Sequence, residues 1–194
     1  GETMILPIVA YGHPVLRKVA QDITPDYPGL KEFINDMFET MYKSDGVGLA
    51  APQVNRSIRI FVIDASHFAE QQPELEGFKK AFINAHITEE SGEEWIFNEG
   101  CLSVPDIRED ISRKPKIRIE YDDENFVHHD EVFEGIAARI IQHEYDHLDG
   151  ILLVDRVSQL RKMLLKRKLN DISTGNIEVS YKMIFPAKKS KVKI

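Results

Sequence analysis

The segment QHEYDHLDG (142–150) constrains the fold more than any other stretch of this chain. It lies in a helix predicted over about 133–148, which has isoleucines along its apolar side. A spacing of four residues places His143 and His147 one turn apart on the same face of that helix, so both imidazole rings can bind one metal ion. Glu144 is adjacent to this face and can contact a metal-bound water without being a ligand. Such a site normally needs a third protein ligand, whose identity separates the possible reactions.

No third ligand follows the second histidine at a spacing that zinc peptidases use. One class of zinc peptidase places a third histidine six residues after the second, but Leu153 occupies that position. Another class uses a glutamate from the next helix, whereas this chain has no glutamate between Glu144 and Glu178. The sequence therefore argues against a peptidase built on the same helix, and this alternative is kept for testing.

An upstream segment, NEGCLSVP (98–105), offers a better third ligand. It contains Cys101, the only cysteine of the chain, and a thiolate is a strong ligand for iron(II) or zinc. Gly100 would relieve crowding where the backbone meets the site. A lone cysteine more often serves as a small buried apolar residue, but the two histidines at ligand spacing favour a metal-ligand role here. Cys101, His143 and His147 would leave a fourth coordination position open, which is typical of a catalytic metal site.

The segment GVGLAAPQVN (46–55) has almost no side-chain bulk, so another backbone could approach it closely. It lacks the spacing and the lysine of a phosphate-binding loop. Gln53 could donate a hydrogen bond to a developing oxyanion. A helix C-cap followed by a tight packing turn explains the same residues equally well, and this segment alone does not separate the two interpretations.

The remaining patterns predict helices and short strands in separate groups. A first helix over about 28–46 would bury one stripe, formed by Leu30, Phe33, Ile34, Met37, Phe38 and Met41. Strands are predicted over 57–64, 80–88, 94–99, 116–122 and 125–134. The helix over 133–148 has Ile136, Ile140 and Ile141 on its apolar side, and a last helix over 155–171 is predicted to be amphipathic through Val157, Leu160, Met163 and Leu164. Strands grouped between helices indicate an α+β fold with largely antiparallel sheets.

Composition indicates one ordinary catalytic domain over residues 1–194, in which residues 1–3 could be a cloning remnant. The net charge of −7 argues against general or sequence-specific nucleic-acid binding, and no apolar run is long enough to span a membrane. A single cysteine permits no internal disulfide and favours a reducing cytoplasm. Residues 180–194 form a basic tail with five lysines and no acidic residue. We interpret this tail as a solvated, frayed end, with docking to an RNA-rich partner such as the ribosome as the alternative.

Taken in order, GVGLAAPQ, EGCLS and QHEYDHLDG resemble the three motifs of the peptide deformylases, and the resemblance spans residues 46–150. The opening ILPIVAYGHPVLRKVA is also similar to the N-terminus of that family. The resemblance implies sheets packed around a central helix that carries HExxH. It also implies a cytoplasmic hydrolase of protein biosynthesis that removes the N-formyl group from the initiator methionine of nascent polypeptides.

The resemblance also implies roles for individual residues. The metal, typically iron(II) with zinc, nickel or cobalt also accepted, would be held by Cys101, His143 and His147. The general acid and base would be Glu144, and the oxyanion would be bound by the Gln53 side chain and the backbone N–H of Leu102. Substrate contacts are expected from Gly48, which would pair with the peptide backbone, and from Val47, Gly100, Arg108 and Ile140.

Two further polar residues are candidates for orienting the ligand histidines, because metal-bound imidazoles usually donate their second N–H. These candidates are Glu99 and Asp146. For Asp146, a surface salt bridge is an equally plausible role. The pair His128–His129 lies in a predicted strand and is expected to be exposed. The second alternative is a catalytically silent binding module. Such a module would be expected to lack a metal ligand, Glu144 or Gln53, and this chain has all of them.

Overall fold

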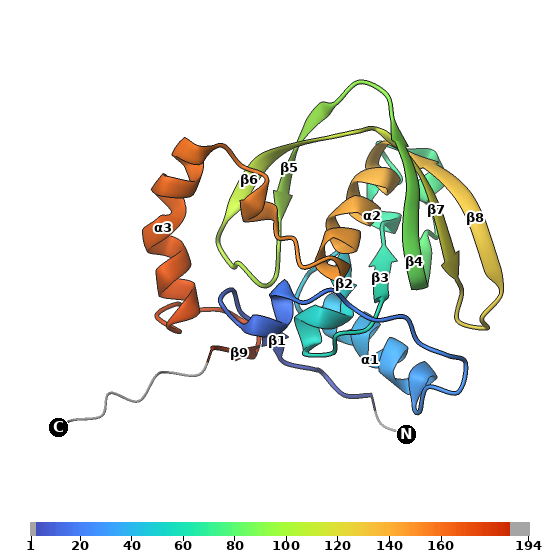
Figure 1. The fold of residues 1–194 in the computed structure, drawn as a ribbon, viewed down its shortest axis with the longest axis horizontal. Coiled ribbons are helices and arrows are strands. Elements are labelled where there is room, and N and C mark those ends of the chain that lie inside the picture. The colour runs from blue at the N-terminus through green and yellow to red at the C-terminus, as the bar shows by residue number, and fades with distance from the viewer. Residues whose placement is uncertain (1–2, 187–194) are drawn as a thin grey trace.

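The computed structural model describes residues 3–186, which form an α+β fold with largely antiparallel sheets, as predicted (Figure 1). The helices are α1 (Leu30–Lys43), α2 (Gly135–Leu148) and α3 (Gln159–Ser173). The strands are β1 (Ile8–Val9), β2 (Gly48–Ala50), β3 (Ile60–Asp64), β4 (Lys79–Ser91), β5 (Trp95–Gly100), β6 (Arg108–Arg113), β7 (Lys116–Asp122), β8 (His128–Glu134) and β9 (Met183–Ile184). No described helix is long and apolar enough to cross a membrane.

The main sheet has five strands in the order β2-β3-β4-β7-β8, and every neighbouring pair is antiparallel. Strands β5 and β6 form a separate antiparallel hairpin. Helix α2 lies between this hairpin and the main sheet, in the middle of the molecule (Figure 1). The central position predicted for the helix with the HExxH motif is therefore confirmed.

Strand β3 explains how the main sheet is covered on both faces. Ile60 and Val62 pack with the apolar stripe of α1, whereas Phe61 and Ile63 point to the opposite face and pack with α2. Successive side chains of a strand alternate between faces, so one short apolar run serves two layers. Burying each of these large side chains contributes about 1.5–3 kcal/mol. All six predicted stripe residues of α1 are buried, which confirms that helix.

Strand β6 was not predicted. Its sequence REDISR has the alternating burial of a strand, but the inward positions include Glu109 and Arg113. Charged residues that point inward conceal the apolar period of two on which strand prediction depends. The five predicted strands correspond to β3, β4, β5, β7 and β8; the bounds of β7 are as predicted, and the ends of the other four are shifted.

The predicted apolar face of α3 is wrong. Leu160, Met163 and Leu164 are 65%, 73% and 62% exposed, whereas Leu165 and Ile172 are buried. These two buried residues lie seven positions apart, about two turns, and so share one face of the helix. In Figure 1, α3 lies to one side of the body, so only a narrow face of it is covered. The helix therefore packs through a different face from the one predicted.

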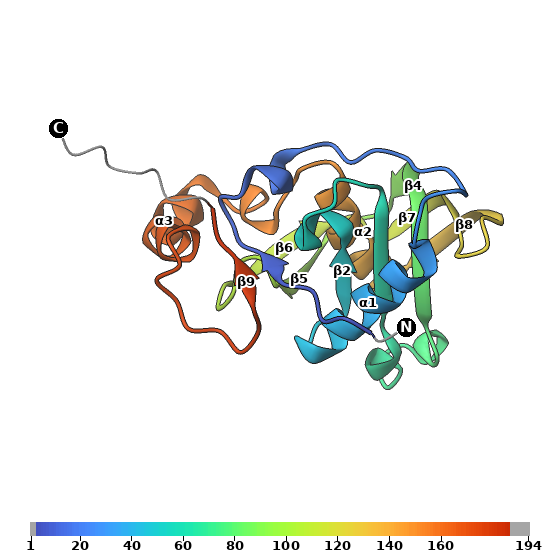
Figure 2. The same cartoon turned by 90° about the horizontal axis from the view of Figure 1, so that it is seen from below.

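The chain after α3 returns to the body, and the expectation of a frayed end is wrong for its first part. Strand β9 pairs in parallel with β1, which places residues 183–184 beside residues 8–9 (Figure 2). Residues 187–194, which carry four of the five lysines of the basic tail, lie outside the described residues.

Candidate metal centre

The structure brings the three predicted ligands together. Cys101 directly follows β5, and His143 and His147 lie on α2. One ligand atom from each of the three residues lies within 4.8 Å of the others, which no other group of His, Cys, Asp or Glu achieves within residues 3–186. The Sγ of Cys101 is 3.5 Å from Nε2 of His147. A tetrahedral ion with bonds of about 2.3 Å to sulfur and about 2.1 Å to nitrogen would set this distance at about 3.6 Å. The donor set therefore fits one bound metal ion.

Glu144 lies beside the ligands, and among residues 3–186 it pairs with no arginine or lysine. It is buried, and no described group bonds its Oε2 atom. Its Oε1 atom is 3.9 Å from Nε2 of His143. Burial raises the pKa of Glu144 to about 7, although the charge of His143 opposes this shift. A carboxylate with a free oxygen in this position is able to exchange a proton with a molecule bound beside it.

The low side-chain bulk of the segment 46–55 has a structural reason at Gly48. A Cβ atom at that position would lie 2.7 Å from Oε1 of Glu144, so any larger residue would displace the carboxylate. Gly48 begins β2, which is the edge strand of the main sheet. The N–H of Gly46 bonds the carbonyl of Met41, so the segment does cap α1, but it continues into a strand rather than a packing turn. The helix-cap interpretation is therefore right in part, and the approach of another backbone to this segment stays a prediction.

Gln53 lies in the short 3₁₀ helix Ala51–Val54, directly after β2, and its side chain is buried. The N–H of Ala50 donates to Oε1 of Gln53 at 3.0 Å, which fixes the orientation of the amide. Its Nε2 atom then points toward the cluster, 3.5 Å from Sγ of Cys101 and 3.2 Å from Oγ of Ser103. The side chain thus presents a fixed donor to the metal centre.

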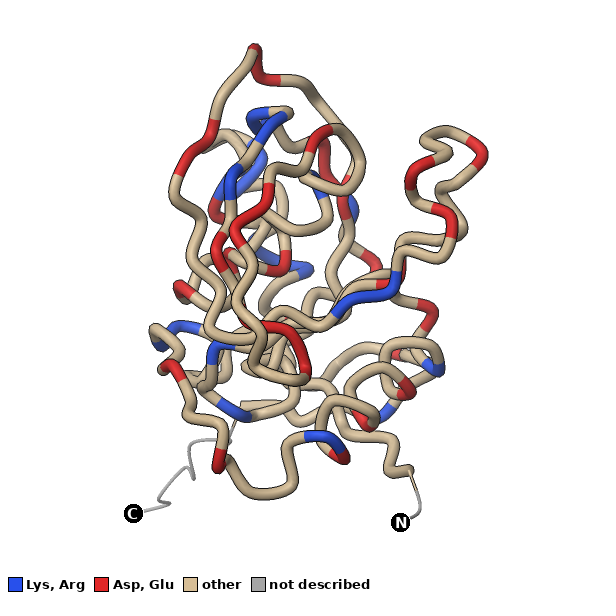
Figure 3. The backbone as a smooth tube through the Cα atoms, turned by 90° about the vertical axis from the view of Figure 1, so that its right-hand side faces the viewer, with Lys and Arg blue, Asp and Glu red and all other residues tan. Residues whose placement is uncertain are grey.

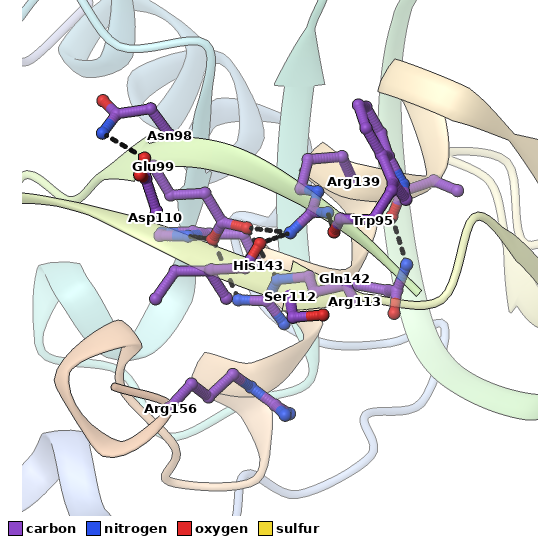
Figure 4. A network of polar contacts seen from close by, with 12 residues as sticks. Trp95, Asn98, Glu99, Asp110, Ser112, Arg113, Arg139, Gln142, His143 and Arg156 are labelled. Carbon is purple, nitrogen blue, oxygen red and sulfur yellow. Dashed lines mark hydrogen bonds and ion pairs between the residues drawn. The ribbon is translucent and has the colours of Figure 1, made fainter. Parts of the chain in front are cut away.

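A buried network of charged residues surrounds the ligand helix (Figure 4). Glu99 accepts from Nδ1 of His143 at 2.9 Å, which is the orienting contact predicted for it. Arg113 donates to both carboxylate oxygens of Glu99, at 2.8 and 2.9 Å, and Arg139 donates to one of them at 2.8 Å. Burial alone would raise the pKa of Glu99, but the hydrogen bonds from His143 and Arg113 outweigh it and hold that pKa far below its usual range. Glu99 is therefore a permanent anion.

Asp146 does not orient a ligand histidine, and it forms salt bridges instead, although it is buried rather than at the surface. It is buried, and it binds Arg113 at 2.8 Å and Arg156 at 2.6 Å rather than a ligand histidine. Its position on α2 explains this arrangement, because it is one residue before His147 and points to a different side of the helix. Nδ1 of His147 is buried and has no hydrogen-bond partner among residues 3–186.

A cleft of about 620 Å³ opens onto the metal centre. Its walls include all five predicted substrate contacts, namely Val47, Gly48, Gly100, Arg108 and Ile140, and also Gln53, Cys101, Leu102, His143 and Glu144. Arg108 is held toward β5, where its Nε donates to Oδ1 of Asn98 at 2.8 Å. His147 is buried beneath the cleft and does not line it.

Sequence reasoning missed three residues around this cleft. Arg139 precedes His143 by one helical turn, so its place on the ligand face could have been found from spacing alone. Arg113 and Tyr181 carried no such signal, because they reach the site from β6 and from the segment after α3. The pair His128–His129 lies on β8 among acidic residues, away from the cleft, as expected.

Charge is spread over the molecule rather than collected in one basic stripe. In Figure 3, acidic positions are distributed along the loops and strands with lysines and arginines between them.

Comparisons with known proteins agree with one another. A family model described as polypeptide deformylase matches residues 5–163. A peptide deformylase of Flavobacterium johnsoniae is 58% identical, with 96% of this chain and 98% of the relative covered. One from Christiangramia forsetii is 56% identical, over 97% of this chain and all of the relative.

Solved structures show the same relationship. A peptide deformylase of Plasmodium falciparum is 39% identical with a TM-score of 0.77, and the match covers 87% of this chain and 95% of that one. A peptide deformylase from Legionella pneumophila is 35% identical, also with a TM-score of 0.77, over 89% and 98% of the two chains. The chain therefore belongs to the polypeptide deformylase family, metal-dependent hydrolases that remove the N-formyl group from the initiator methionine of newly made proteins.

Proposed function

We propose that this chain deformylates nascent polypeptides with Glu144 as general acid and base, and with Gln53 and the N–H of Leu102 as donors to the oxyanion. The metal would be held by Cys101, His143 and His147. The observation that carries the proposal is the cluster of Cys101, His143 and His147 at the base of a cleft whose walls include Gln53, Leu102 and Glu144. The alternative of a peptidase lacks the downstream ligand that such enzymes use.

The bound metal would acidify a water and polarise the formyl oxygen, since two neutral imidazoles and one thiolate leave an M²⁺ site with a net positive charge. Glu144 takes the proton of the attacking water and gives it to the leaving amine. Its free Oε2 atom supports this role, because a carboxylate paired with arginine would be a poor base. The second carboxylate, Glu99, holds His143 in place and stays ionised throughout.

The cleft also supports selection of the substrate. Gly48 lies on β2, which is an edge strand of the main sheet, where an extended peptide can add as another strand. Val47 and Ile140 offer apolar surface for the methionine side chain. Because Glu144 lies directly against Gly48, the reacting end of the cleft is narrow, and formyl is the smallest acyl group. Acetylated peptides are therefore excluded on size.

Replacing Gln53 with alanine tests the oxyanion assignment. We expect kcat to fall by about 10²–10³-fold, because one preorganised oxyanion donor is worth about 3–4 kcal/mol of the barrier. KM should change little. The exposed Gln21, outside the cleft, gives a matched control in Gln21→Ala, which should retain full activity. An unchanged kcat in Gln53→Ala, with the metal bound, would exclude the assigned role.

We further propose that iron(II) is the native metal, with zinc, nickel or cobalt accepted by the same ligands. A thiolate and two imidazoles suit all of these ions, so the choice depends on supply and geometry. The iron(II)-loaded protein should lose activity in air during an ordinary purification, because the metal and Cys101 are oxidised together. Activity of the iron(II)-loaded protein is measured before and after exposure to air, with the zinc-loaded protein as control. Full activity of the iron form in air would contradict the assignment.

We place this activity in the cytoplasm, where nascent chains are made and a free thiol stays reduced. Docking of the basic tail on the ribosome stays a prediction, since most of its lysines lie outside the described residues.

A further inference from the structure

The turn that follows β5 is held through three consecutive backbone carbonyls. The carbonyl of Cys101 accepts from the N–H of Val104 at 3.0 Å, and that of Ser103 accepts from the N–H of Tyr11 at 2.9 Å. The carbonyl between them, on Leu102, accepts from the hydroxyl of Tyr181 at 2.7 Å. Only this last bond comes from a side chain, so a single substitution can remove it without altering the backbone.

Tyr181 is brought to this turn by the pairing of β9 with β1. The N–H of Ile8 donates to the carbonyl of Lys182 at 2.9 Å, and the N–H of Ala10 donates to that of Ile184 at 2.8 Å. These bonds belong to the β1–β9 pair, which lies between α3 and α1 (Figures 1 and 2). As a result, residues 178–181 line the same cleft as the metal ligands. The segment after α3 is therefore part of the wall of the active site.

The Tyr181 hydrogen bond acts on the residue whose N–H matters for the reaction. Among residues 3–186, no acceptor bonds the N–H of Leu102, so this donor is available to a ligand in the cleft. The side chain of Leu102 packs only in part with the core. The N–H of Leu102 shares a rigid peptide plane with the carbonyl of Cys101, which bonds the N–H of Val104. The Tyr181 hydroxyl holds the next peptide plane, which carries the carbonyl of Leu102, so the two bonds together fix the backbone angles of Leu102. Oxyanion donors are effective only when they are fixed before the reaction begins.

We propose that Tyr181 is a positioning residue for deformylation, which holds the peptide plane that follows Leu102 and so helps to fix the backbone angles at which the N–H of Leu102 points at the formyl oxygen. This inference rests on the role proposed above for Leu102. It also assigns a function to the C-terminal segment, whose pairing with β1 delivers the hydroxyl to the turn.

Tyr181→Phe removes the hydroxyl and keeps the ring. We expect kcat for formyl-Met-Ala-Ser to fall about tenfold, because small displacements of catalytic groups are costly, while KM stays within about twofold. The deformylated product Met-Ala-Ser lacks the formyl oxygen, so its inhibition constant should be unchanged. Metal content and melting temperature should match those of Tyr27→Phe, a control that removes a tyrosine hydroxyl bonded to Arg56 outside the cleft.

Two outcomes would overturn the inference. An unchanged kcat in Tyr181→Phe would show that the hydroxyl does not position the turn for catalysis. A joint change in KM, product inhibition and melting temperature would assign Tyr181 a purely structural role. Both outcomes can be distinguished from an error in the proposed mechanism itself. If that mechanism were wrong, Gln53→Ala and the Glu144 variants would keep their activity as well.

Discussion

Glu144→Gln is expected to keep its metal and to lose about 10³-fold in kcat. Glutamine has the shape of glutamate and can still form hydrogen bonds, but it cannot accept a proton from water, and general acid–base catalysis contributes about 10²–10⁴-fold to such reactions. The metal should remain bound, because Glu144 is not one of the three clustered ligand residues. Metal content is measured by elemental analysis and kcat by formate release.

Two comparisons separate this effect from damage to the fold. Glu144→Ala should be equally inactive, so loss of the proton acceptor rather than of a hydrogen bond is responsible. Glu70→Gln, an exposed position outside the cleft, should behave as the unchanged protein. A metal-loaded Glu144→Gln that turns over at a comparable rate would refute the assigned base.

The second large effect is expected at Glu99. Its carboxylate is shared by Arg113, Arg139 and His143, all of them buried. Glu99→Ala would leave two buried arginines without this partner, and breaking a buried ion pair in this way costs about 3–5 kcal/mol. The free energy of unfolding of the metal-free protein, measured in urea, should fall by that amount.

Metal affinity should fall in the same variant. Glu99 fixes the ring of His143, and loss of such an orienting partner weakens metal binding by about 10–100-fold. Asp130→Asn provides the control, since it breaks an exposed ion pair with Arg118 and should cost less than about 1 kcal/mol. If Glu99→Ala and Asp130→Asn destabilise the protein equally, the buried network does not have the importance assigned to it.

The sequence predicted the parts of the structure that follow from local periodicity. The stripe of α1 and the two histidines of α2 repeat at helical spacing, so their faces could be derived before any contact was known. Cys101 could be matched to the histidines because their ligand chemistry is complementary. The resemblance to deformylases then supplied roles that spacing alone left open at Gln53 and Leu102.

The parts that were missed depend on tertiary contacts. Glu109 and Arg113 point inward from β6 because each meets an opposite charge on another element, which no local pattern reports. The exposed face of α3 was misassigned because three apolar residues at helical spacing suggest burial, although the buried apolar residues of this helix are Leu165 and Ile172. Tyr181 reaches the cleft only through the pairing of β9 with β1.

Formate release from formyl-Met-Ala-Ser by iron(II)-loaded protein, purified without oxygen, tests the central claim most directly. Acetyl-Met-Ala-Ser and unmodified Met-Ala-Ser are the controls. The account predicts formate from the formyl peptide, no acetate from the acetylated peptide, and no cleavage of an internal peptide bond in any of the three. Internal cleavage without formate would identify a peptidase instead, and metal binding with no reaction would identify a binding module.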